Sequence, residues 1–82
     1  METEIVLYTK KDCPLCQEAK ELIETLSYDY EIVIREKDIY EEDELIERYG
    51  LMIPVVEMDG EEVDYGKIDL FSLSNRLQKK KG

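Results

Sequence analysis

Two cysteines three positions apart, in the segment Cys13-Pro14-Leu15-Cys16, constrain the fold of this chain more than any other feature. The segment follows a short apolar run at residues 5–8, of the kind that forms a strand buried on both faces. It opens a stretch in which apolar side chains recur at helical spacing, namely Cys16, Ala19, Leu22, Ile23 and Leu26. The sequence therefore predicts a strand, a polar loop over residues 9–12, and a helix through about residue 27 with both thiols at its start.

The rest of the chain continues the alternation of strand and helix patterns. Residues 30–34 predict a second strand, and the spacing is that of a right-handed βαβ unit, whose two strands run parallel. Residues 40–49 predict a second helix that ends at Gly50. Residues 54–58 and 61–63 predict a β-hairpin around Asp59-Gly60, and residues 68–80 predict a third helix. The predicted class is α/β, in the order β-α-β-α-β-β-α.

Length and charge limit the classes of function. The 82 residues suffice for one small domain, spanning residues 1–82, with a modest core. Eleven basic residues against 21 acidic ones leave a net charge of −10, which argues against nucleic acid as a partner. No apolar run approaches the roughly 20 residues that span a bilayer, and the acidic start differs from that of a signal peptide. We therefore expect a cytoplasmic protein with no membrane partner, in a compartment where paired cysteines are usually catalytic or metal-binding.

The placement of the two thiols predicts different roles for them. If the helix begins at Pro14, Cys13 occupies the N-cap, where free N–H groups and the positive end of the helix dipole stabilise a thiolate. Cys16 lies one turn further along the same face and can attack a mixed disulfide formed at Cys13. Lys10 and Lys11 stabilise the thiolate further or are simply solvated loop charges. Cys13 is therefore predicted to be the attacking thiol and Cys16 the resolving thiol.

Other uses of a Cys-x-x-Cys pair stay open at this point. Zinc usually takes four ligands, and this chain has two cysteines and no histidine, so we expect no metal site within one chain. A dimer could pool four cysteines around zinc or an iron–sulfur cluster. A redox-sensing module would use the same disulfide as a switch. A purely structural bridge is disfavoured because so short a loop removes little entropy from the unfolded chain.

Three segments, residues 8–16, 53–54 and 65–69, give the chain its resemblance to a glutaredoxin, within the thioredoxin-fold superfamily, and the resemblance covers nearly the whole sequence. It implies a thioredoxin (glutaredoxin-like) fold, with a four-stranded mixed sheet flanked by helices, and a cis peptide bond before Pro54, next to the cysteine pair. It also implies that a peptide-like thiol binds in extended form along the backbone of residues 52–54. If that thiol is glutathione, its γ-glutamyl end would lie near Gly66, Lys67 and Asp69, and its glycyl carboxylate near Lys10.

Apolar residues around the thiols are expected to form an exposed rim that receives a disulfide substrate. They are Pro14, Leu15, Met52, Ile53 and Tyr65. Met52 and Ile53 could instead pack into the core. Gly66 could serve only as a turn glycine, and Asp69 only as a first-turn carboxylate favoured by the helix dipole.

We expect a monomeric thiol-disulfide oxidoreductase that reduces protein or low-molecular-weight disulfides and holds no tightly bound cofactor. Its electron donor stays open between glutathione and a thioredoxin-reductase-type flavoenzyme. Leu15 stands where typical glutaredoxins have an aromatic residue, and the net charge of −10 would repel anionic glutathione.

Overall fold

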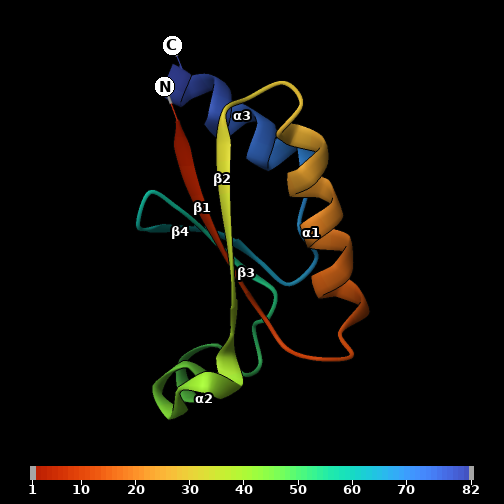
Figure 1. Cartoon of the computed structure of the whole chain (residues 1–82), viewed down its shortest axis with the longest axis vertical. Helices are drawn as coiled ribbons and strands as arrows, with labels where there is room; N and C mark the ends of the chain where they lie inside the picture. Colours follow the sequence, from red (N-terminus) through yellow and green to blue (C-terminus); the bar gives the residue numbers. More distant parts are fainter. Residues whose placement is uncertain (1, 82) are drawn as a thin grey trace.

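The structure, a computed structural model, describes residues 2–81, with side chains as far as residue 79. Its elements are β1 (Thr3–Thr9), α1 (Pro14–Leu26), β2 (Ile32–Asp38), the 3-10 turn η1 (Ile39–Glu41), α2 (Asp43–Tyr49), β3 (Val55–Met58), β4 (Glu61–Tyr65) and α3 (Leu70–Lys81). The four strands form one sheet in the order β2-β1-β3-β4, in which β1 and β2 are parallel and the other pairs antiparallel (Figure 1). The predicted order of elements and the mixed four-stranded sheet are confirmed.

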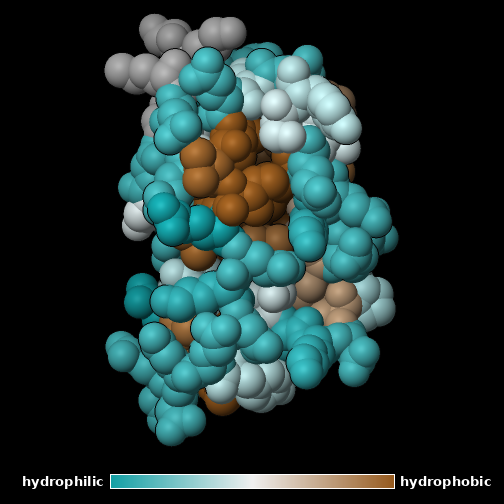
Figure 2. All heavy atoms as spheres, viewed as in Figure 1, coloured by the Kyte–Doolittle hydropathy of each residue, from teal (hydrophilic) through white to brown (hydrophobic). Residues whose placement is uncertain are grey.

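Alternating side chains of the sheet divide the core into two clusters, because successive residues of a strand point to opposite faces. The larger cluster lies under α1 and α3 and contains Ile5, Leu7, Ala19, Ile23, Leu26, Val56, Met58, Ile68, Leu73 and Leu77. The smaller cluster lies under α2 and contains Tyr8, Ile39, Leu45, Tyr49 and Val55. Figure 1 shows α1 alongside the sheet and α2 at its far end. Figure 2 shows hydrophobic atoms that reach the surface in a hollow between the sheet and α1.

The second strand is longer than the sequence predicts. The prediction ended it at residue 34, whereas β2 continues through three charged residues, Arg35, Glu36 and Lys37, to Asp38. It pairs with β1 from Thr3↔Ile32 to Thr9↔Asp38 and lies at the edge of the sheet. An edge strand has side chains that reach water, so it tolerates charges that would be costly in a central strand.

The second predicted helix, residues 40–49, is broken in two. Glu42 has an extended backbone, with φ −139° and ψ 130°, and separates η1 from α2. A cap that the prediction missed explains the early turn, since the Asp38 side chain accepts a hydrogen bond from the Tyr40 N–H at 2.9 Å. Both halves still contribute to the smaller cluster: η1 buries Ile39, and α2 buries Leu45 and Tyr49.

Gly50 ends α2 as predicted, although for a different physical reason. A glycine after a helix usually adopts a positive φ, whereas Gly50 has φ −53° and stays right-handed. A Cβ at this position would lie 2.5 Å from the carbonyl oxygen of Ile46. The chain therefore needs glycine here because the helix backbone passes too close for a side chain.

The third helix begins at Leu70, two residues later than predicted. Across residues 2–81, none of the helices combines the length and the apolar character needed to cross a membrane.

Candidate active site

The two cysteines lie at the start of α1, with the local geometry that the sequence predicts. Cys13 is the N-cap, with an extended backbone at φ −114° and ψ 103°, and Pro14 is the first helical residue. The Cys13 Sγ accepts a hydrogen bond from the Cys16 N–H at 3.2 Å. The Cys13 carbonyl accepts the first helical hydrogen bond, from the Gln17 N–H at 3.1 Å. The Cys16 N–H, which has no acceptor within the helix, therefore points at the sulfur that would carry the negative charge.

The two sulfur atoms are joined in a disulfide, with the Cα atoms 5.2 Å apart. The cysteines differ in exposure: Cys13 is half-buried, whereas Cys16 is only 4% exposed. A large disulfide substrate can approach Cys13 from solvent, and Cys16 can be reached mainly by a group already attached to Cys13. This difference in exposure matches an attacking thiol followed by a resolving thiol.

A groove of about 810 Å³ opens beside the disulfide. Its lining includes both cysteines and Pro14, and the loop before α1 contributes Lys10 and Lys11. That loop turns at Asp12, whose φ of 56° lies in the left-handed region that aspartate tolerates better than most residues. Within the described part of the chain, neither lysine has a carboxylate within salt-bridge distance. Both ammonium groups are therefore available to an anion that approaches Cys13.

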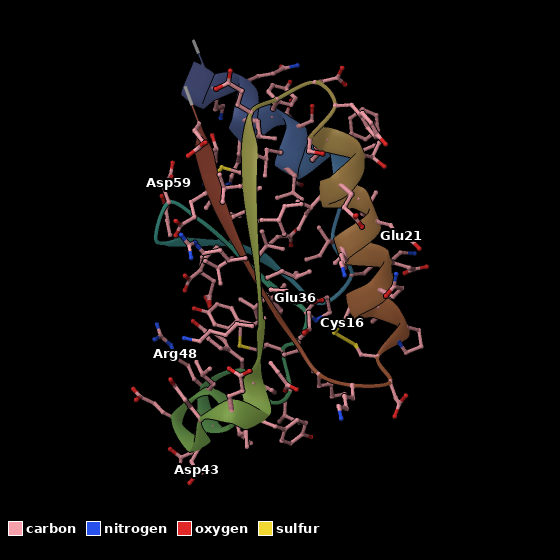
Figure 3. The ribbon with its side chains drawn as sticks, in the orientation of Figure 1. Cys16, Glu21, Glu36, Asp43, Arg48 and Asp59 are labelled. Carbon is pink, nitrogen blue, oxygen red and sulfur yellow. A yellow bond between two sulfur atoms is a disulfide. The ribbon has the colours of Figure 1, made fainter. Side chains whose placement is uncertain are left out.

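Three carboxylates on the same groove were missed by the prediction: Glu36, Asp38 and Glu41. Two of them belong to the part of β2 beyond the predicted strand end, and Glu41 lies in η1. The alternation Ile32, Ile34, Glu36, Asp38 was the available signal, because period-two spacing places all four side chains on the face of the sheet covered by α1. Figure 3 shows Glu36 on β2 and Cys16 on α1, and both side chains line this groove.

The peptide bond between Ile53 and Pro54 is cis, and Pro54 is fully buried. Most hydrogen-bonding groups of the adjoining backbone are already engaged. The N–H groups of Met52 and Ile53 both donate to the Tyr49 carbonyl, at 2.8 and 3.1 Å. The Met52 and Pro54 carbonyls both accept from the Gly66 N–H, at 3.0 and 2.8 Å. Among residues 2–81, the Ile53 carbonyl accepts no backbone hydrogen bond, so it is the group on this segment left for a substrate.

Gly66 has φ +73°, a left-handed conformation that favours glycine. A Cβ built on it would meet nothing within 4 Å, so the space next to its Cα is open. Its N–H ties the end of β4 to the segment around Pro54. Gly66 is thus a turn glycine, and it also borders open space beside the segment expected to receive a substrate.

Asp69 caps the start of α3, and both oxygens of its carboxylate accept hydrogen bonds there. One carboxylate oxygen accepts from the Phe71 N–H at 3.2 Å, and the other accepts from the Ser72 hydroxyl at 3.1 Å. The sequence suggested a carboxylate within the first turn of the helix, whereas Asp69 precedes α3 and accepts hydrogen bonds from its first turn. Asp69, Gly66, Ile53 and Pro54 do not line the groove beside the cysteines.

The expected apolar rim is only partly exposed. Leu15, at the start of α1, is 41% exposed, and Tyr65, at the end of β4, is 58% exposed. Both therefore offer apolar surface to a substrate. Met52 and Ile53 are half-buried and pack against the smaller core cluster. Leu15 also lines a second, smaller hollow together with Lys67 and Ile68.

Two tyrosines are buried on the face of the sheet opposite α1. The rings of Tyr8 and Tyr49 lie 4.6 Å apart, and the Tyr49 hydroxyl donates to Glu57 at 3.4 Å. Burial raises the pKa of Tyr8 to about 12, and the Glu57 carboxylate adds to the shift. Burial also raises the pKa of Tyr49. Both phenols therefore stay neutral at physiological pH.

Among the described residues, there is no group of three or more histidine, cysteine or acidic side chains arranged to hold a metal ion.

Comparison with known proteins identifies the family and the fold of this chain. The family model of the Glutaredoxin-like domain (DUF836) matches residues 4–78. A protein from Nitrosomonas europaea, solved by solution NMR, is similar with a TM-score of 0.82 at 19% identity, over 92% of this chain and 91% of that chain. An X-ray structure of a protein from X. campestris is similar with a TM-score of 0.76 at 26% identity, over 92% of this chain and 96% of that chain.

A mutant thioredoxin from Halobacterium salinarum is similar with a TM-score of 0.70 at 23% identity, over 94% of this chain and 73% of that chain. These likenesses confirm the thioredoxin-type, glutaredoxin-like fold. With a Cys13–Cys16 pair at the start of α1, this fold indicates a redox function.

Proposed function

Because the chain belongs to the glutaredoxin-like domain family (DUF836), we propose that it is a thiol-disulfide oxidoreductase that reduces protein or small-molecule disulfides through Cys13 and Cys16. The observation that carries this proposal is the half-buried Cys13 Sγ at the N-cap of α1, next to the almost fully buried Cys16. The N–H of Cys16 and the helix dipole stabilise the Cys13 thiolate, which is the form that attacks a disulfide.

The reaction proceeds in two exchanges. The Cys13 thiolate attacks one sulfur of the substrate, which forms a mixed disulfide and releases the first substrate thiolate. Cys16 then loses its proton and attacks the Cys13 sulfur, which forms the Cys13–Cys16 disulfide and releases the second thiolate. Two electrons pass from the protein dithiol to the substrate, and the two protons of the dithiol end on the released thiols. The disulfide present in the structure is the oxidised end state of this cycle.

A donor must then reduce the disulfide, and we propose glutathione or a thioredoxin-reductase-type flavoenzyme for this role. Lys10 and Lys11 on the groove favour an anionic donor, whereas Glu36, Asp38 and Glu41 oppose one. Backbone pairing on the segment before Pro54 is limited to the Ile53 carbonyl while the N–H of Ile53 donates to Tyr49. The proposed setting is the cytoplasm, with the protein acting as a monomer, without a tightly bound cofactor.

Turnover of the neutral substrate hydroxyethyl disulfide tests the function, with glutathione and its reductase in one reaction and thioredoxin reductase in the other. We expect NADPH oxidation in one of the two reactions. The variant Cys13→Ser should have no activity. Cys16→Ser should accumulate a mixed disulfide at Cys13, visible as added mass that a reducing agent removes.

Equal residual activity in the two variants would contradict the roles assigned to the thiols. No turnover with either donor, together with metal in the freshly purified protein, would favour a metal or iron–sulfur protein. No turnover with no metal would favour a redox-sensing module.

A further inference from the structure

Cys16, the buried resolving thiol, needs a group that accepts its proton. Cys16 must lose a proton before it attacks the mixed disulfide, yet it is only 4% exposed. The chain has no histidine, the side chain that most often accepts protons near neutral pH. Cys16 lines the groove beside the disulfide, so a protein group that accepts its proton is expected among the other residues of that groove.

Glu36 has the best position among the groups on that groove. It lies on β2, opposite Leu7 of β1, on the face of the sheet that α1 covers. Its carboxylate is held by α1 itself, because Lys20 Nζ lies 3.7 Å from Glu36 Oε1. Lys20 follows Cys16 by four residues, so both side chains lie on one face of the helix. Glu36 on β2 and Cys16 on α1, both labelled in Figure 3, line the same groove.

The other charged groups on the groove are less suited to this task. Asp38 accepts a hydrogen bond from the Tyr40 N–H and caps η1. Glu41 is exposed on the 3-10 turn, and the described side chains include no ion pair between Glu41 and α1. Asp12 lies in the loop before α1, next to Cys13 rather than Cys16. The ammonium groups of Lys10 and Lys11 donate hydrogen bonds and have no acceptor.

We propose that Glu36 accepts the proton of the Cys16 thiol, through water in the groove, when Cys16 attacks the mixed disulfide. This inference rests on the proposed oxidoreductase function and concerns its second exchange. The S–H bond of Cys16 breaks, its proton passes to the Glu36 carboxylate, and the Cys16 sulfur bonds to the Cys13 sulfur. The bond between Cys13 and the substrate sulfur breaks at the same time. The departing thiolate then takes this proton from Glu36, through water in the groove, which restores the carboxylate.

A neutral reagent that reports both exchanges separately provides the test. Reduced protein is mixed with an equimolar amount of 2,2′-dithiodipyridine, which releases one absorbing thiopyridone when Cys13 attacks and a second when Cys16 resolves. Cys16→Ser identifies the second phase, because that variant should show only the first. For Glu36→Gln we expect an unchanged first phase and a second phase slower by about tenfold or more at neutral pH. This effect lies below the usual range of about 10²–10⁴-fold for a positioned base because the groove is open to water.

A matched control separates this role from a general effect of charge. Glu4 also pairs with a cation between β1 and β2, since Arg35 Nε lies 3.1 Å from Glu4 Oε2. The Glu4 side chain is 49% exposed, against 46% for Glu36, but it points to the opposite face of the sheet. Glu4→Gln makes the same change in net charge and should leave both phases unchanged. Glu36→Asp, which keeps a carboxylate, should recover part of the second-phase rate.

The pH dependence distinguishes proton transfer from damage to the fold. At high pH hydroxide ionises Cys16 directly, so the second-phase rates of Glu36→Gln and the wild type should converge. A second phase that is unchanged in Glu36→Gln overturns the proposal. A faster one does so too, because it shows that Glu36 acts only as a charge that disfavours the Cys16 thiolate. Equal slowing in Glu4→Gln also overturns it. A wild type without any second phase would instead contradict the proposed function itself.

Discussion

Replacing Gly66 with alanine tests whether this glycine serves only the turn or also leaves room for a substrate. Gly66 has φ +73°, and the left-handed conformation costs an L-residue about 1–2 kcal/mol. Alanine also restricts the unfolded chain, which returns about 0.4–1 kcal/mol. No atom lies within 4 Å of the added Cβ, so no clash adds to the cost. We therefore expect a net loss of about 1 kcal/mol, which lowers the Tm of a domain this small by about 4–8 °C.

Gly60 provides a matched control for this substitution. It has φ +86°, a Cβ on it would also meet nothing within 4 Å, and it lies in the turn between β3 and β4. Gly60→Ala should therefore lose about as much stability as Gly66→Ala. The added methyl group at position 66 enters open space beside the segment tied to Met52 and Pro54. For that variant alone we expect the KM for hydroxyethyl disulfide or the thiol donor to rise about tenfold, equivalent to about 1.4 kcal/mol.

Urea denaturation followed by circular dichroism gives the two stabilities, and steady-state turnover gives the two KM values. A loss at Gly66 several-fold larger than at Gly60 would refute the inference that the surrounding space is empty. Equal KM values in both variants and the wild type would refute a substrate role for Gly66 and leave it as a turn glycine.

Other predictions concern the core, the buried phenols and the end of α2. Ile23→Ala should lower the free energy of unfolding by about 2–5 kcal/mol, measured by urea denaturation, because this side chain is fully buried between α1 and the sheet. Since the pKa of Tyr8 is raised to about 12, the native state keeps a proton that the unfolded state loses above about pH 10. Stability should therefore fall as pH rises from about 10 to 12, and urea midpoints of Tyr8→Phe should fall less over that window. Gly50→Ala should destabilise the protein through the 2.5 Å approach to the Ile46 carbonyl and lower its Tm, whereas a Tm equal to that of the wild type would contradict that contact.

Local features of the sequence were sufficient to predict the element order and the position of the cysteine pair. The N-cap geometry of Cys13 and the place of Pro14 depend on residues within one helical turn, so spacing alone predicts them. The hairpin depends on the Asp59-Gly60 turn, where both residues have positive φ. The cis bond before Pro54 was expected from the family resemblance alone, since proline spacing does not distinguish cis from trans.

Tertiary structure alone decided which groups surround the thiols and which remain available to a substrate. β2 extends through Glu36 and Asp38 because β1 offers a parallel partner along its whole length, and residue types do not encode that pairing. The Ile53 N–H donates to the Tyr49 carbonyl. The Gly66 N–H, just after β4, donates to carbonyls of the segment that precedes β3. Such contacts join residues from different parts of the chain, so their energy depends on how the elements pack. Sequence thus determined where the redox pair lies, and packing determined the charges and hydrogen-bonding groups with which it works.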